Sequence, residues 1–257
     1  MQPGWTEACP RGALRLDPAT VDLWSIGLDR VGSRSCGELL GVLSVDERAR
    51  MARFRHERDA RRWGIARGAT REVLASYVGI APSKLVFRQG TSGKPALETG
   101  DGVRFNVSHS GPEALIAVAR GFEVGVDVEL IREGLLEDAI AQRVPGDLAV
   151  RLATIESPRV RTRTFFRAWV CHEATVKCRG IGITEVASAG LTDHVWIEEL
   201  DLGEGYAAAL AVDVVTLHVR PVVRRLVWQR WPDVGAKLTC VAPSDHAPDD
   251  GRLEVLE

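Results

Sequence analysis

The chain has 257 residues, of which 45% are hydrophobic and 26% are charged, and its formal net charge at pH 7 is −2. These are the values of an ordinary globular protein, long enough to bury one large core or two small ones. The small net charge gives no overall attraction to nucleic acid or to a membrane surface. Because we find neither a signal-peptide pattern nor an apolar run that could span a bilayer, we expect a cytoplasmic protein without membrane association.

The first predicted elements are an extension, a strand and a helix. Residues 1–20 contain Gly and Pro and few apolar positions, which predicts a loose N-terminal extension. Residues 21–28 alternate between apolar and polar side chains, as a strand does. Ser44 is followed three residues later by Glu47, and this spacing predicts the capping box of a helix.

The next segment is unusually rich in arginine, with only Glu57 and Asp59 as acidic residues. Its nine arginines are Arg48, Arg50, Arg53, Arg55, Arg58, Arg61, Arg62, Arg67 and Arg71. Most of them are expected to face solvent. Arg55, Arg58 and Arg62 follow helical spacing and can point the same way, and guanidinium groups match phosphate well.

Further along the chain, short apolar segments alternate with turn residues. We expect a turn at residues 90–95, then strands at 105–108, 114–118 and 124–130, and a helical segment at 135–152 that Pro145-Gly146 interrupts. A long helix is predicted from Arg163 to Arg179, ended by Gly180. Strands are expected at 195–197, 207–214 and 217–219, followed by a flexible acidic tail from about residue 231.

Two of these elements carry charges that become meaningful together. Asp127 and Glu129 alternate onto one face of the predicted strand, and Glu173 and Lys177 stand one turn apart on the long helix. Separately, each pair is typical of a solvated surface. If the two faces meet, three carboxylates converge, and such a group is stable only when a cation neutralises it. Carboxylate oxygens suit Mg²⁺, which leaves its other positions to water and phosphate.

Four motifs occur in a fixed order along the chain. They are Ser92-Gly93-Lys94-Pro95, Phe105-Asn106-Val107-Ser108-His109-Ser110-Gly111, Gly125-Val126-Asp127-Val128-Glu129 and Trp169-Val170-Cys171-His172-Glu173-Ala174-Thr175-Val176-Lys177. Together they resemble the 4′-phosphopantetheinyl transferases, in particular the larger, monomeric, pseudo-dimeric class (Sfp-type). The resemblance extends from about Leu43 to Ile183 and resumes near Gly205-Tyr206.

The resemblance implies an α+β fold of two similar lobes, each a small antiparallel sheet with a long helix, related by a pseudo-twofold axis. We therefore expect an N-terminal lobe over residues 21–115, with the arginine-rich helix binding coenzyme A, and a C-terminal lobe over residues 116–230 with the metal site. Residues 1–20 and 231–257 would lie outside both lobes.

It also implies an activity: transfer of the 4′-phosphopantetheine arm of coenzyme A to a serine of an apo acyl or peptidyl carrier protein, releasing 3′,5′-ADP. Mg²⁺, with Mn²⁺ as a substitute, would be held by Asp127, Glu129 and Glu173. The catalytic residues would be Glu173, as base, with Lys177 and His109 at the diphosphate. Coenzyme A would be bound by Arg55, Arg62, Gly93, Lys94, Pro95, Ser108, His109 and Lys177.

Two positions depart from the family pattern. His172 stands where a lysine is usual, so one cationic contact becomes weaker and dependent on pH. After the acidic strand, Arg143-Val144-Pro145-Gly146 replaces an arginine followed by two aromatic residues, which leaves the choice of carrier protein open.

Two other classes of function compete with the enzyme. A non-catalytic relative that binds coenzyme A or a carrier protein would have no reason to keep the cluster of Asp127, Glu129, Glu173 and Lys177. A nucleic-acid-binding protein is disfavoured by the net charge and by the shortage of stacking aromatic residues beyond Trp63. Ser108 and His109 do not indicate a serine hydrolase, because adjacent strand residues face opposite ways and no G-x-S-x-G motif is present.

Overall fold

The computed structural model describes residues 5–8, 14–90, 93–99, 102–132, 146–180, 194–215, 217 and 219–228. Within these ranges the chain forms three sheets and the helices α1, α2, α3, α5 and α6, a mixed α+β fold as predicted. None of the helices in these ranges combines the length and apolar character needed to cross a bilayer.

The largest sheet has the strand order β1-β10-β2-β6-β5. Its strands are β1 (Thr6–Ala8), β10 (Val222–Trp228), β2 (Thr20–Gly27), β6 (Glu113–Arg120) and β5 (Val103–Ser110). The strands β2, β6 and β5 pair antiparallel, whereas β10 runs parallel to both β1 and β2. The strand β5 therefore forms one edge of this sheet.

The helix α3 (Glu57–Val78) packs on one face of the large sheet, and α1 (Ser33–Gly41) and α2 (Val45–Met51) pack against α3. The capping box predicted at Ser44 and Glu47 begins α2. On α3, Ile65, Ala69 and Leu74 are buried in one cluster with Trp24 of β2 and Ile116 of β6. Glu57 and Arg58 at the start of α3 are exposed, whereas Arg71, further along the helix, is buried.

A second sheet, of order β7-β9-β8, carries the long helix α6 (Pro158–Arg179). Its strands are β7 (Val124–Leu130), β9 (Tyr206–Asp213) and β8 (Val195–Glu199), all antiparallel. Ala207, Ala209 and Ala211 alternate along β9 and form a buried cluster with Val170 and Ala174 of α6. These small side chains let the helix approach the sheet closely.

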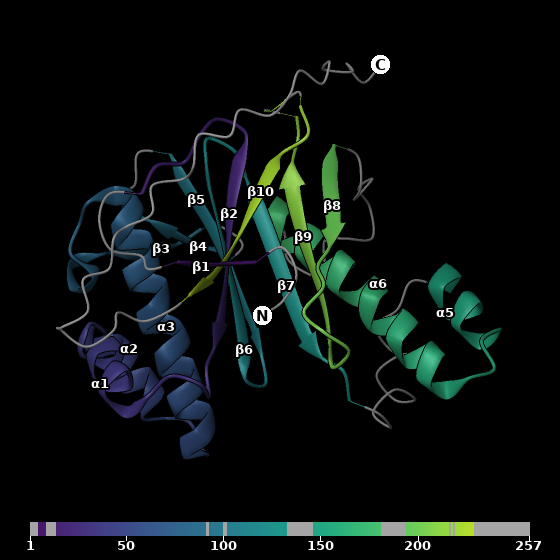
Figure 1. Ribbon diagram of the computed structural model, residues 1–257, viewed down its shortest axis with the longest axis horizontal. Coiled ribbons are helices and arrows are strands. Elements are labelled where there is room, and N and C mark those ends of the chain that lie inside the picture. The colour runs from purple at the N-terminus through teal and green to yellow at the C-terminus, as the bar shows by residue number, and fades with distance from the viewer. Residues whose placement is uncertain are drawn as a thin grey trace.

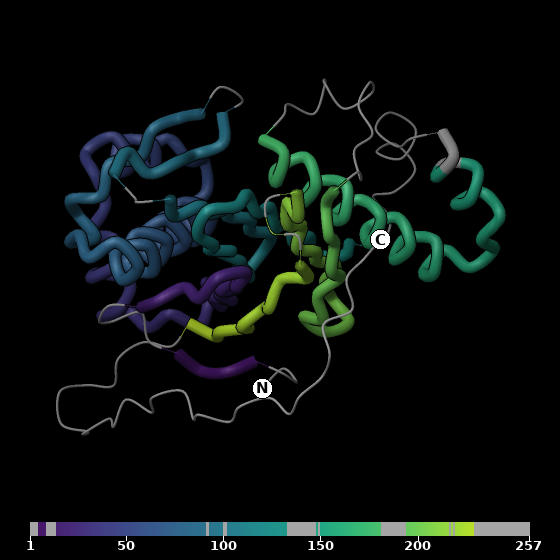
Figure 2. The backbone as a smooth tube through the Cα atoms, turned by 90° about the horizontal axis from the view of Figure 1, so that it is seen from above, coloured from purple at the N-terminus to yellow at the C-terminus, as the bar shows by residue number. Residues whose placement is uncertain are grey.

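The helices lie on opposite sides of the strands, with α1, α2 and α3 at one end of the molecule and α6 with α5 (Gly146–Ala153) at the other (Figures 1 and 2). Between them, Leu23 and Leu115 of the large sheet share a buried cluster with Val126 and Leu210 of the second. The two sheets thus have a common core. A separate hairpin, β3 (Phe87–Gln89) and β4 (Pro95–Leu97), follows the short 3-10 helix Pro82–Lys84 and carries the G-K-P loop.

Several expectations about the outer parts of the chain are wrong. The N-terminal extension is not loose throughout, because Thr6–Ala8 pair with β10 as β1 and Trp5 is buried. Leu217 and Val219 lie in a turn and a bend, and the strand begins later, at Val222. This strand pairs with β2 from the other end of the chain, a contact that no local pattern reveals.

The predicted division at residues 115 and 116 falls inside β6, and β10 returns from the second half of the chain to the large sheet. The helix α6 begins earlier than expected, at Pro158, with Ser157 as its N-cap, and it ends as predicted at Gly180 in the left-handed conformation. Of the segment predicted as helix over 135–152, only α5 is described. The predicted tail from residue 231 lies outside the described residues.

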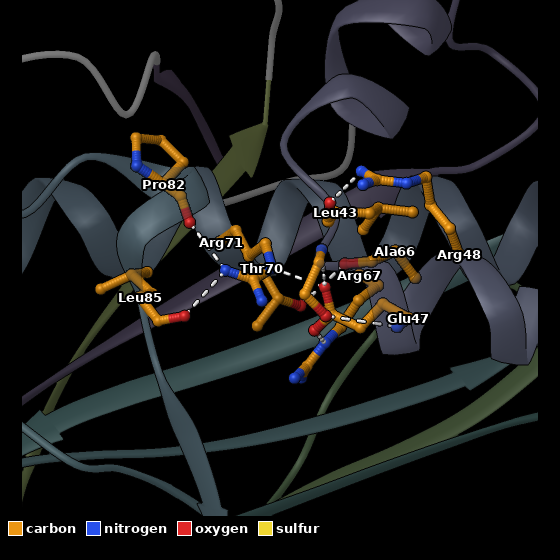
Figure 3. Close-up of polar contacts among 10 residues, drawn as sticks. Leu43, Glu47, Arg48, Ala66, Arg67, Thr70, Arg71, Pro82 and Leu85 are labelled. Atoms are coloured by element: carbon orange, nitrogen blue, oxygen red, sulfur yellow. Dashed lines mark hydrogen bonds and ion pairs between the residues drawn. The ribbon is translucent and has the colours of Figure 1, made fainter.

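A buried ion-pair network fixes α2 against α3 (Figure 3). The Glu47 carboxylate accepts hydrogen bonds from Arg67 Nε (2.5 Å) and Arg71 Nε (2.7 Å). Arg71 also donates to the carbonyl oxygens of Pro82 (2.8 Å) and Leu85 (3.0 Å), and its side chain is only 3% exposed. Burial would raise the pKa of Glu47, but the hydrogen bonds from Arg71 and the Ser44 amide hold it below its usual range.

We predict that Glu47→Ala lowers the free energy of unfolding by about 3 kcal/mol or more, because it leaves the buried Arg71 guanidinium without its carboxylate. Urea unfolding measures the change. Asp46→Ala removes an exposed carboxylate from the same turn and should cost less than about 1 kcal/mol. Equal losses for the two variants would contradict the role of the network.

Candidate functional site

The predicted site lies where two sheet edges meet. The strand β5 is an edge of the large sheet and β7 is an edge of the second. Side chains of β5, rather than its backbone, bond to the backbone of β7. The amides of Val126, Val128 and Leu130 donate to the side-chain oxygens of Asn106 (2.9 Å), Ser108 (3.4 Å) and Ser110 (3.0 Å), in that order. The edge amides of β7 are thereby satisfied without a backbone ladder.

The helix α6 lies directly on the backbone of β7 at Gly125. A Cβ atom on this glycine would stand 2.0 Å from the Ala174 carbonyl oxygen and 2.4 Å from the Cys178 amide nitrogen. Only a residue without a side chain permits this approach. It brings the helix residues Glu173 and Lys177 over the acidic stretch of β7.

Asp127 is paired with Lys177, and this contact joins the charged residues of β7 to those of α6. The Lys177 ammonium forms an ion pair with Asp127 Oδ1, which also accepts a hydrogen bond from Ser108 Oγ (2.8 Å). Asp127 is 3% exposed, and its second oxygen, Oδ2, has no hydrogen-bond partner among the described residues. A buried carboxylate oxygen in this state is ready to accept a ligand.

Glu129 occupies the next position on the same face of β7 and accepts a hydrogen bond from Ser110 Oγ (2.7 Å). Burial raises the pKa of Glu129, Ser110 opposes the increase, and the charge of Asp127 adds to it. Glu173 is buried, with 8% of its surface exposed. Across the described ranges, however, no three His, Cys, Asp or Glu side chains form a group that could hold a metal ion. The three carboxylates are therefore not preassembled as a metal site.

Two histidines belong to the motifs that carry this site, His109 on β5 and His172 on α6. His109 is the exposed residue between Ser108 and Ser110 on β5. Partial desolvation lowers the pKa of His109, and the charges of Lys177 and Arg50 lower it further. His172 is half-buried near Trp169, with 6.1 Å between the ring centroids, and burial lowers its pKa as well. The cationic groups near His109 match the needs of a bound phosphate.

The arginines predicted to bind coenzyme A are arranged differently from the expectation. Arg55 lies in the segment between α2 and α3, so it does not share a helix face with Arg58 and Arg62. Arg62 is on α3, and its guanidinium donates two hydrogen bonds to Asp29 (2.8 and 2.5 Å). These bonds lower the pKa of Asp29. Arg62 therefore has an internal anion as its partner.

In the G-K-P loop, the Lys94 ammonium donates to Glu123 Oε2 (2.7 Å) and to the carbonyl oxygens of Val124 (2.9 Å) and Cys178 (3.4 Å). Cys178 is in the last turn of α6, where a cation is favoured by the helix dipole. Gly93 has a φ of 79°, which suits glycine, and Pro95 begins β4. The Lys94 side chain thus connects the loop to α6 and β7.

Sequence reasoning missed four residues that position this site: Asn106, Ser110, Gly125 and Asp29. The alternation of Asn106, Ser108 and Ser110 at every second position of a strand was a visible signal, because small polar side chains are uncommon on a buried face. Gly125 gave a weaker signal, a glycine inside a strand, which often marks close approach of another backbone. No local pattern connects Asp29 with Arg62.

Comparison with known proteins relates this chain to one family. The model for the N-terminal part of 4′-phosphopantetheinyl transferases matches residues 34–120. The 4′-phosphopantetheinyl transferase HetI of Nostoc is 34% identical over 191 residues, covering 72% of this chain and 78% of the relative. A 4′-phosphopantetheinyl transferase of Bacillus subtilis is 28% identical over 186 residues, or 69% and 81% of the two chains. Sfp of Bacillus subtilis is 26% identical over 165 residues, or 64% and 72%.

We predict that Gly125→Ala destabilises the protein by about 1–3 kcal/mol, because α6 must move away from β7 to admit the methyl group. Urea unfolding provides the measurement. Gly37→Ala is a matched control in α1, where the added Cβ meets nothing within 4 Å. A helical alanine should stabilise the chain there by about 0.5–1 kcal/mol. Stabilisation at both glycines would contradict the close approach.

Proposed function

Since the chain belongs to the 4′-phosphopantetheinyl transferase family, we propose that the site between β5, β7 and α6 carries out its reaction. The chain is an enzyme that transfers phosphopantetheine from coenzyme A to carrier proteins. The ion pair between Lys177 and Asp127 carries the assignment of the site, because it joins the acidic motif of β7 to the motif of α6.

We infer that the diphosphate of coenzyme A binds beside Lys177 and His109. His109 belongs to β5 and Lys177 to α6, and the charges of Lys177 and Arg50 both act on the His109 imidazole. An anionic diphosphate would favour the protonated form of His109 and so strengthen its own binding. Lys177 would donate a proton or a hydrogen bond to the leaving oxygen.

The carboxylates fit a magnesium ion, for which manganese is a reasonable substitute. Asp127 presents a buried oxygen without a partner, and Glu129 stands beside it on the same strand face. Magnesium commonly takes only one or two protein carboxylates and completes its shell with water and substrate phosphates, so no preassembled group of three is required. Asp127 and Glu129 would hold the ion, with Glu173 as the third proposed ligand. When bound, the ion would neutralise charge on the diphosphate.

The transfer step requires a base from this chain, whereas the nucleophile is the serine of the carrier protein. The hydroxyl oxygen of the carrier serine attacks the phosphorus that bears the pantetheine arm, and the bond from that phosphorus to the bridging diphosphate oxygen breaks. Glu173 accepts the serine proton, and 3′,5′-ADP departs with the bridging oxygen. Glu173 is suited to this role because α6 holds it, buried, one turn from Lys177.

The finer assignments remain part of the same proposal. We propose that Arg62 and Arg55 contact the nucleotide, with the G-K-P residues Gly93, Lys94 and Pro95 beside its base and Ser108 near the phosphates. The large sheet with α3 and the second sheet with α6 would be the two lobes of a pseudo-dimeric enzyme that acts as a cytoplasmic monomer. Its protein substrate would be an apo acyl or peptidyl carrier.

We predict that the protein converts an apo carrier to its holo form with coenzyme A and Mg²⁺, and that Glu173→Gln and Asp127→Asn each abolish the conversion. Mass spectrometry of the carrier measures the added phosphopantetheine, and chelation of the metal should stop the reaction. Circular dichroism should show that both variants remain folded. A parent protein that binds coenzyme A without modifying any carrier would instead support a non-catalytic relative.

We predict that Arg62→Ala weakens binding of coenzyme A far more than binding of dephospho-coenzyme A, because only the former carries the 3′-phosphate. The loss of one charge-assisted hydrogen bond corresponds to about 1.5–3 kcal/mol. Calorimetric titration with both ligands measures the difference. Arg58→Ala, one turn away on α3 and 72% exposed, should affect both ligands little. Equal losses of the two affinities in Arg62→Ala would place the 3′-phosphate elsewhere.

A further inference from the structure

We propose that Asn106, Ser108 and Ser110 form a side-chain ladder that positions the acidic strand, and that Ser110 is the positioning residue of Glu129. The ladder consists of these three side chains of β5 and the amides of Val126, Val128 and Leu130. This inference rests on the proposed function of the site, since it concerns how the metal-binding carboxylates are oriented.

The ladder has a constant register. Each of its three pairs is separated by 20 residues along the chain, so β5 and β7 run side by side in the same direction. The side chains at alternate positions of β5 point toward β7, and alternate amides of β7 point away from its partner β9. Side-chain oxygens thereby take the place that carbonyl oxygens hold in a parallel sheet.

Two rungs of the ladder also bind a carboxylate. Ser110 Oγ accepts from the Leu130 amide at 3.0 Å and donates to Glu129 Oε2 at 2.7 Å. Ser108 Oγ accepts from the Val128 amide at 3.4 Å and donates to Asp127 Oδ1 at 2.8 Å. Each serine therefore fixes a backbone amide of β7 and the carboxylate of the residue just before it. Asn106 contributes a backbone contact alone, at Val126.

The number of hydrogen bonds that a hydroxyl can donate and accept determines which partner receives its proton. A hydroxyl has one proton to donate and two lone pairs to accept with. Because the amide of Leu130 occupies a lone pair of Ser110, the hydroxyl proton is directed at Glu129. Ser108 is saturated, since Lys177 Nζ also donates to it at 3.3 Å. Ser108 can donate to a phosphate only by releasing Asp127, so its first role is to orient that carboxylate.

Partners in the outer shell of a metal site commonly change metal affinity or activity by 10- to 100-fold. We therefore expect Ser110→Ala to raise the concentration of Mg²⁺ needed for half-maximal transfer roughly 10-fold, with kcat at saturating Mg²⁺ close to that of the parent. Ser110→Thr keeps the hydroxyl and should restore the parent value. Ser76→Ala is the control, because it removes a buried hydroxyl that bonds within α3, to the Glu72 carbonyl oxygen.

A binding measurement separates positioning from activity. Mn²⁺ is titrated into each variant saturated with coenzyme A, without a carrier protein, and free Mn²⁺ is followed by electron paramagnetic resonance. The dissociation constant should rise in Ser110→Ala in parallel with the Mg²⁺ requirement, and stay at the parent value in Ser110→Thr and Ser76→Ala. Thermal unfolding is recorded for all four proteins.

The outcomes are distinct. If the parent transfers phosphopantetheine but Ser110→Ala binds Mn²⁺ as the parent does, the positioning role is wrong and the proposed function stands. If Ser110→Ala loses kcat and thermal stability together at every metal concentration and Ser110→Thr does not restore them, the hydroxyl is merely structural and the inference is also wrong. A parent that transfers nothing would overturn the proposed function itself.

Discussion

The contact between α6 and the backbone of β7 at Gly125 is the constraint on which the site depends. The carboxylates of β7 and the Glu173–Lys177 pair come from separate elements, and only their spacing makes them one site. The small alanine side chains of β9 allow α6 to approach the sheet closely, and Gly125 allows α6 to contact the backbone of β7. Backbone contact of this kind leaves little freedom for the helix to shift, because protein interiors are closely packed.

The close contact between α6 and β7 also places charged side chains in a buried region with little access to water, since Asp127 and Glu173 are both buried. Asp127 and Glu129 share one strand face, and the pKa of Glu129 is raised by burial and by its acidic neighbour. In the protein without ligands, Lys177 and the serine hydroxyls offset part of this repulsion. A cation that entered the site would replace some of these contacts, so the fold supplies a temporary counter-charge rather than a fixed one. Functional sites commonly lower the stability of the folded protein in this way.

Local patterns in the sequence predicted most of the elements that carry the site. The capping box of α2, the strands β5, β6 and β7, and the end of α6 at Gly180 each have a local physical cause, and all are confirmed. The strands β1 and β10 were missed because β10 pairs with β1 and with β2, both of which lie at the other end of the chain. The pairing of Arg62 with Asp29 has the same non-local origin. The meeting of the two charged motifs followed from the family resemblance, since spacing alone could not place a helix on a strand.

The cations expected to bind coenzyme A already have internal partners, and these partners differ in how readily they can be replaced. Asp29 is 46% exposed at its side chain, and exchanging such a carboxylate for a phosphate costs little because exposed ion pairs are weak. Lys94 instead bonds to backbone carbonyl oxygens at the end of α6 and the start of β7, which cannot leave without moving the elements themselves. Its side chain therefore holds the G-K-P loop in place, and contact with a ligand falls to the backbone of that loop.

Lys177 lies between these cases, because its partner Asp127 is itself a proposed ligand of the metal. Separating the Lys177–Asp127 ion pair therefore requires an anion to bind the ammonium and a cation to bind the carboxylate. A diphosphate bound together with magnesium supplies both charges at once.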